Sequence, residues 1–129
     1  MAVALTLCVA APAWAEEAQH SDDQASKLIS LLNQYRQGDA TCEGEQRGAL
    51  APLAPDTRLS RVDLTPGNSW QEVLRDAGYQ AANIQALQLS GPASAAAAMD
   101  ALSSRYCDVL LGSDFADVGV RHDGATWQL

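Results

Sequence analysis

The sequence predicts an α+β domain, a compact α-β-α sandwich with a small, mainly antiparallel sheet between helices. Apolar residues recur at helical spacing in three stretches of the chain, and three shorter stretches show the alternation of strands. Turns that contain glycine or proline separate these stretches. The resulting order of helix, helix, strand, helix, strand, strand is typical of a layered α+β domain.

The first residues have the pattern of an export signal. An apolar, uncharged stretch, Ala2–Ala11, precedes Ala13-Trp14-Ala15, the small-x-small pattern behind which signal peptidase cleaves. We therefore interpret residues 1–15 as a signal peptide. Its start would be incomplete, because no Lys or Arg precedes Lys27. The apolar run is too short for a membrane span, which needs about 20 residues. An N-terminal core helix is the alternative.

Cleavage after Ala15 would leave two of the three cysteines, Cys42 and Cys107. Export places the chain in an oxidising compartment, periplasmic or extracellular, where we expect these two cysteines to pair. The bridge would close a loop of about 65 residues and stabilise the domain by about 4 kcal/mol on the chain-entropy model.

The charge balance argues against nucleic-acid partners. The formal net charge is −8 at pH 7. Such an acidic surface repels phosphate backbones and anionic lipid headgroups.

The chain that remains after cleavage of the signal peptide is of ordinary size for one domain. We expect residues 16–21 to form a disordered entry and residues 22–129 to form a single domain.

The first helix is predicted over Asp22–Gln37. The sequence Ser21-Asp22-Asp23-Gln24 has the form of a capping box, and Gly38 can end the helix. Apolar residues follow at positions i, i+3, i+4 and i+7 and form one stripe: Leu28, Leu31, Leu32 and Tyr35.

The middle of the chain combines a loop with two helices. Gly44–Pro55 is predicted to be a loop, followed by a short helix over Asp56–Val62 and a chain break at Thr65-Pro66-Gly67. A second capping box begins at Ser69, and Gly78 ends that helix. Its predicted apolar stripe comprises Trp70, Val73, Leu74 and Ala77.

A strand and a third long helix follow. Ile84–Leu89 carries apolar residues on both faces, which indicates a strand covered on both sides. Pro92 is predicted to begin the next helix, as proline does at a first helical position. One side of that helix, which ends near Cys107, carries Ala95, Ala98, Met99, Leu102 and Tyr106.

The chain is predicted to end in a hairpin of Asp117–Arg121 and Ala125–Leu129. Asp123-Gly124 is typical of a two-residue type I′ turn. That turn would place Val120 opposite Trp127, and Val118 opposite Leu129.

Four short motifs, in this order, resemble the CAP superfamily of cysteine-rich secretory, antigen 5 and pathogenesis-related 1 proteins. They are Asn33-x-x-Arg36, Ala77-Gly78-Tyr79, Arg105-Tyr106-Cys107 and Val118-Gly119-Val120 before a tryptophan strand. The resemblance spans about Leu28–Trp127 and implies an α-β-α sandwich with a cleft beside the sheet. It also implies that Cys42 and Cys107 pair.

The chain departs from the family where the family's cleft binds metal. Members often carry two histidines and two acidic residues there. The region Leu59–Trp70 has no histidine, Tyr106 stands where the second histidine is common, and Ala82 replaces the acid before Asn83. None of these four cleft residues can therefore be carried over, and we predict neither a metal nor another cofactor.

Catalytic patterns are weak in the rest of the chain. His20 and His122 are not spaced as metal ligands, and no G-x-S-x-G elbow accompanies the serines. We therefore predict no catalytic residue.

The candidate groove residues are Tyr106 and Asn83, whose hydroxyl and amide are suited to a polar-headed ligand; alternatively, Tyr106 packs on the first helix. The predicted function is non-catalytic binding of a cell-envelope component or a small lipid-like molecule. Weak hydrolysis of peptides or cell-wall material, and a purely structural role, are the alternatives.

Overall fold

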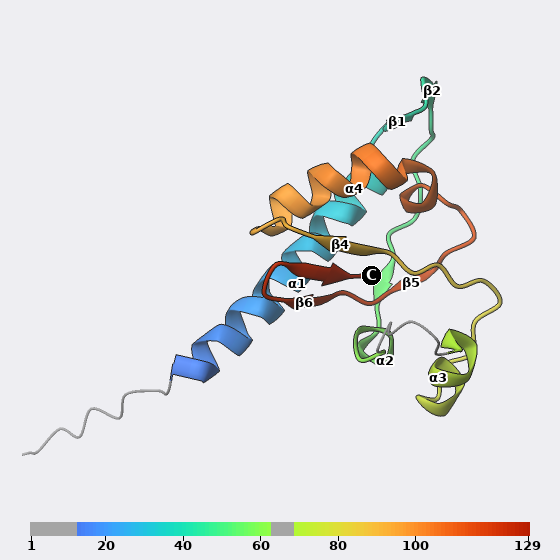
Figure 1. Cartoon of the computed structure of the whole chain (residues 1–129). Coiled ribbons are helices and arrows are strands. Elements are labelled where there is room, and N and C mark those ends of the chain that lie inside the picture. Colours follow the sequence, from blue (N-terminus) through green and yellow to red (C-terminus); the bar gives the residue numbers. More distant parts are fainter. Residues whose placement is uncertain (1–12, 63–68) are drawn as a thin grey trace, which may run out of the picture.

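The structure, a computed structural model, describes residues 13–62 and 69–129 (Figure 1). The predicted α+β class is confirmed. The helices of this part of the chain are α1 (Ala13–Gln37), α2 (Thr57–Ser60), α3 (Trp70–Asp76) and α4 (Ala95–Leu110). The strands are β1 (Thr41–Cys42), β2 (Glu45–Gln46), β3 (Ala54–Pro55), β4 (Gln88–Ser90), β5 (Asp117–Val118), β6 (Arg121–Asp123) and β7 (Thr126–Gln128).

Two predictions fall wholly or largely outside the described residues. They are the chain break at Thr65–Gly67 and the signal peptide over residues 1–15, of which only the last three belong to α1. None of the described helices is both long and apolar enough to cross a membrane.

Helix α1 ends at Gln37 as predicted but begins at Ala13 rather than Asp22. The predicted disordered entry, residues 16–21, is helical instead. That segment contains neither glycine nor proline, so nothing in it interrupts a helix. The predicted capping box therefore lies inside α1, where Gln24 has another role: its Oε1 accepts the main-chain N–H of Ala95 at 2.9 Å, at the start of α4.

The central sheet has the antiparallel order β4-β7-β6. Leu89 and His122 lie opposite Trp127 from its two sides, so these three residues share one face of the sheet. This face meets the helices, because α1 packs on α4 and on β6. Leu89 and Trp127 are buried there, with Trp127 fully inaccessible to solvent.

The other face of the sheet carries polar residues. Gln88, Gln128 and Arg121 lie opposite one another across the three strands. In Figure 1, α4 lies on one side of these strands, and the short helices α2 and α3 lie on the other side. The helices therefore form two unequal layers about the sheet.

The register of the terminal hairpin differs from the prediction by two residues. His122, not Val120, lies opposite Trp127, and the turn is Gly124-Ala125. Gly124 has a φ of +60° while Ala125 is not among the residues with positive φ, which fits type II′ rather than type I′. The predicted pairs Val120–Trp127 and Val118–Leu129 are therefore wrong, although the even shift keeps Trp127 on the buried face.

The predicted strand Asp117–Arg121 is divided between two sheets. Its first part, β5, joins β3 in parallel, with Ala54 opposite Asp117. Strand β3 lies at the end of the segment Gly44–Pro55 that was expected to be a loop. Gly119 separates β5 from β6, and a Cβ atom added there would overlap the main chain of Leu59 and Ser60. Helix α2 can lie this close only because residue 119 has no side chain.

Helix α4 begins at Ala95, not at Pro92. Ser94 caps it, and its Oγ accepts the N–H of Ala97 at 3.2 Å. Pro92 instead accepts the indole N–H of Trp127 on its main-chain oxygen at 2.9 Å. The predicted apolar stripe is buried at Ala95, Ala98, Met99 and Leu102. At Tyr106 the backbone leaves helical geometry, with φ −131° and ψ 28°, and the helix continues past this kink to Leu110.

The close approach at Gly119 predicts a large effect of a small substitution. Gly119→Ala should lower the free energy of unfolding by about 1–3 kcal/mol, because the new methyl group meets main-chain atoms that cannot move aside. Gly48→Ala is the matched control, since nothing lies within 4 Å of an added Cβ there. Urea unfolding would measure both variants, and equal losses of stability would contradict the packing of α2 on Gly119.

Candidate functional site

A mostly apolar cleft lies between the polar face of the sheet and helices α2 and α3. Its volume is about 130 Å³. Aliphatic and aromatic side chains line most of it, among them Leu59, Val62, Leu74, Ile84, Val109 and Phe115. Gln128 and Arg121 border it from the sheet, and the side chain of Trp70, which is 38% exposed, borders it from α3.

Tyr79 reaches the cleft because α3 ends as the sequence predicts. Gly78 adopts a φ of +83°, and the N–H of Tyr79 returns to the carbonyl oxygen of Leu74 at 2.8 Å. The Tyr79 hydroxyl then donates to Asp117 Oδ2 at 2.6 Å. This hydrogen bond, together with burial, raises the pKa of Tyr79 to about 12. The pair ties the segment after α3 to β5.

Arg58 supports Tyr79 from α2. Its guanidinium lies over the Tyr79 ring, 5.0 Å from the ring centre, and Nη1 donates to the carbonyl oxygen of Gly78 at 2.8 Å. Two further bonds, of 3.1 and 2.7 Å, join it to the carboxylate of Asp56, which caps α2. The hydrogen bond from Arg58 holds the pKa of Asp56 below its ordinary value. Tyr79 and Asp117 therefore form the polar end of the cleft, and Arg58 and Asp56 support Tyr79 from outside the lining.

The predicted groove residues are separated by this arrangement. Asn83 lines the cleft, whereas Tyr106 is not among its lining residues. Tyr106 is half-buried at the kink of α4 and packs against the hydrophobic core. Tyr106 therefore packs against the core and does not contribute to the cleft. Tyr79 and Asp117 were missed as site residues; the glycine before Tyr79 was the available signal.

The motif residues Asn33 and Arg36 are structural. Asn33 exchanges two hydrogen bonds with the main chain of Leu53, at 2.7 and 3.0 Å. Arg36 is 2% exposed and donates to the carbonyl oxygens of Ala51, Leu110 and Gly112. These bonds hold the apolar wall of the cleft that includes Leu53 and Leu110.

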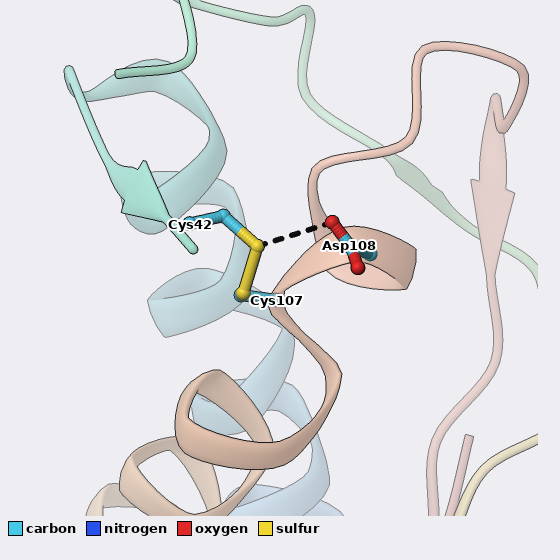
Figure 2. A group of neighbouring side chains, drawn as sticks. All are labelled: Cys42, Cys107 and Asp108. Carbon is cyan, nitrogen blue, oxygen red and sulfur yellow. Dashed lines mark hydrogen bonds between the residues drawn. A yellow bond between two sulfur atoms is a disulfide. The ribbon is translucent and has the colours of Figure 1, made fainter. Parts of the chain in front are cut away.

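Cys42 and Cys107 form the predicted disulfide, with their Cα atoms 5.6 Å apart. Figure 2 shows Asp108 beside it, with Oδ1 3.2 Å from Cys42 Sγ. Because a disulfide sulfur carries no hydrogen to donate, this is a close polar contact. The same carboxylate oxygen pairs with Arg47 at 2.9 Å. The disulfide joins residues that are 65 positions apart in the sequence and covalently connects the segment after α1 to the last turn of α4.

His122 lies on β6, beside the buried Trp127 of β7. Its ring stacks on Trp127, with ring centres 3.8 Å apart and planes 14° from parallel. Both ring nitrogens are buried without a hydrogen-bond partner in the described residues. His122 lies outside the set of residues that line the apolar cleft.

Comparison of the chain with models of known protein families, with curated proteins and with solved structures finds no match.

The raised pKa of Tyr79 predicts a specific loss of stability at alkaline pH. The folded state favours the neutral phenol, so this contribution is complete below about pH 10 and declines as the pH rises toward 12. Tyr79→Phe should be less stable than wild type near neutral pH and should lack this part of the alkaline decline. Urea unfolding across this pH range tests it, with Tyr35→Phe as control; a decline unchanged in Tyr79→Phe would contradict the Tyr79–Asp117 bond.

Reduction of the disulfide should lower the free energy of unfolding by about 4 kcal/mol on the chain-entropy model. The measurement is urea unfolding with and without a dithiol, in a Cys8→Ser background that leaves two cysteines. A Cys42→Ser, Cys107→Ser variant is the control and should not respond to the dithiol. Alkylation of both thiols in the untreated native protein would refute the bridge.

Proposed function

We propose that this chain is an exported, non-catalytic binding domain of CAP type, whose cleft holds the apolar part of a small lipid-like molecule or of an amphiphilic cell-envelope component. The observation that carries the proposal is the apolar cleft with the hydrogen-bonded pair Tyr79–Asp117 at one end. Concave, mainly apolar sites with a few fixed polar groups are typical of small-molecule binding.

The size of the cleft limits its occupant. A volume of about 130 Å³ is close to that of an engineered apolar cavity, roughly 150 Å³, that binds benzene. The cleft therefore suits one ring or a short length of acyl chain, and the rest of a longer ligand would extend past its opening. Trp70 offers exposed apolar surface at that border for such an extension.

Gln128 favours a ligand that carries a hydrogen-bond donor. Its Oε1 is buried without a partner among the described residues, and the residue lines the cleft. A buried acceptor without a partner costs free energy, which a ligand hydroxyl or amide N–H would recover. Tyr79 is not free for this role because its hydroxyl is committed to Asp117.

Export is supported by the disulfide and by the sequence pattern before Glu16. A bridge that joins residues 65 apart is typical of proteins that fold in oxidising compartments. The layered arrangement and the bridge are also those that the CAP resemblance implies, which supports a CAP-type fold without identifying the ligand.

The hydrolase alternative receives less support from the cleft. Asp117 is the one carboxylate among the described lining residues, and no described histidine lines it. Asp117 accepts the Tyr79 hydroxyl, so it is already engaged in a structural hydrogen bond. General acid–base hydrolysis needs a positioned group that is free to exchange a proton with substrate.

Two adjacent alanines provide a direct test of the cleft. Ala81 is half-buried and lines it, whereas Ala82 is exposed and does not. Ala81→Phe should fill the cleft and abolish binding, while Ala82→Phe should bind as wild type does.

The measurement is the thermal stabilisation of each variant by a panel of fatty acids, fatty alcohols, monoacylglycerols and envelope extract. Unfolding is monitored by tryptophan fluorescence, to which Trp70 contributes. A ligand at 100 times its Kd should stabilise the wild type by about 2.7 kcal/mol. Equal stabilisation of both variants would place binding elsewhere. Absence of any stabilisation of the wild type by the panel would contradict the proposed function.

A further inference from the structure

Three potential metal ligands converge at the disulfide, and none of the three lines the apolar cleft. Cys42 Sγ, Cys107 Sγ and a carboxylate oxygen of Asp108 all lie within 4.8 Å of one another. Figure 2 shows that they come from two segments: Cys42 lies on strand β1, and Cys107 and Asp108 lie on the part of α4 beyond its kink. In the oxidised chain the two sulfurs are bonded to each other and are not thiolate ligands.

We propose that reduction of this disulfide converts the group into a binding site for one thiophilic divalent cation of the zinc class. Cys42, Cys107 and Asp108 would be the three protein ligands, and water would complete a tetrahedral shell. Thiolate and carboxylate together favour zinc over magnesium or calcium, which prefer oxygen ligands alone. The site does not depend on the function proposed for the cleft.

The reductive step is a two-electron exchange with a dithiol. Cys107 is half-buried and Cys42 is 1% exposed, so the reductant thiolate attacks Cys107 Sγ. A mixed disulfide forms at Cys107, and Cys42 leaves as a thiolate. The second thiol of the reductant then displaces Cys107, and the reductant leaves as its own disulfide. Binding of the cation releases any protons that the two thiols have taken up.

The ligand geometry of a tetrahedral cation matches this group. Metal–sulfur bonds of about 2.3 Å at a tetrahedral angle place two sulfurs roughly 3.8 Å apart. The two sulfurs are bonded in the disulfide and lie closer than this, so they must move apart after reduction; the wider separation still lies inside the 4.8 Å that encloses the three ligand atoms. Only the two side chains have to move, because the Cα atoms are 5.6 Å apart before reduction.

The neighbouring charges favour a cation in the reduced state. Two thiolates beside the Asp108 carboxylate place three negative charges together, which is unfavourable without compensation. Arg47 supplies one positive charge through its 2.9 Å contact with Asp108, and a dication supplies the other two. Arg47 thereby orients the carboxylate without itself binding the metal, as hydrogen-bonding neighbours of metal ligands do.

Cobalt(II) titration of the reduced full-length chain tests this proposal. In a Cys8→Ser background, the dithiol is removed without oxygen and cobalt is added. We expect one cobalt ion to bind per chain and zinc to displace it. The bound cobalt should give two absorption bands, a thiolate-to-cobalt charge-transfer band and the visible band of a tetrahedral site. The oxidised chain should show neither band. Far-ultraviolet circular dichroism should match between the cobalt-bound and oxidised chains.

Three variants test the role of Asp108. Asp108→Asn should weaken cobalt binding by about tenfold or more, and Arg47→Gln by a similar factor because the carboxylate of Asp108 loses the contact that orients it. Asp114→Asn, at an exposed acid in the following loop, is the matched control and should bind as the parent does. Absence of binding to the reduced chain, whether folded or unfolded, would overturn the proposal. Equal affinity of the Asp108→Asn and Asp114→Asn variants would overturn the role of Asp108.

Discussion

The buried guanidinium of Arg36 is the interaction on which the rest of the fold depends. Burial of a charge costs free energy, and burial also lowers the pKa of Arg36 from its ordinary value. Neither ion pair among the described residues includes Arg36; its hydrogen bonds go to carbonyl oxygens, Leu110 at 2.8 Å, Gly112 at 2.9 Å and Ala51 at 3.3 Å. The first of these lies at the end of α4, where the helix dipole is negative and a cation is favourable. The charge is tolerated only when α1, α4 and the loop at residue 51 are all in place, which makes their assembly cooperative.

The cleft is a consequence of this assembly rather than an independent feature. Arg36 fixes the end of α4, and Asn33, one turn earlier on α1, fixes the main chain of Leu53 through two hydrogen bonds. The chain from Leu53 then enters β3, which pairs in parallel with β5. That pairing positions Asp117 to accept the Tyr79 hydroxyl, and Gly119 allows α2 to approach. Each wall of the cleft is therefore traced back to the last two turns of α1.

Sequence periodicity predicted the elements whose burial is local, and it was less informative about pairings between distant segments. Leu28 and Leu32 on α1, and Ala98 and Leu102 on α4, are buried as their spacing indicates, because a helix turns its apolar stripe to the core regardless of partner. The hairpin register and the β3–β5 pair depend on tertiary packing, which two-residue strands hardly encode. Asn83 lines the apolar cleft and Tyr106 does not. The third long helix was expected to end near Cys107, whereas the chain bends at Tyr106 and α4 continues to Leu110, which the residue pattern did not indicate.

The part of α4 beyond the kink at Tyr106 carries both a covalent and a non-covalent attachment to the rest of the domain. Beyond Tyr106 the last residues of α4 carry Cys107, which is bonded to Cys42, and Leu110, whose carbonyl oxygen accepts from Arg36. The disulfide joins α4 to the turn at β1, while Arg36 joins it to α1 and to the loop at Ala51. Because these attachments use different atoms, reduction of the disulfide does not itself remove the Arg36 and Asn33 hydrogen bonds. The proposed metal site requires that these bonds keep the two thiols and Asp108 close together in the reduced chain.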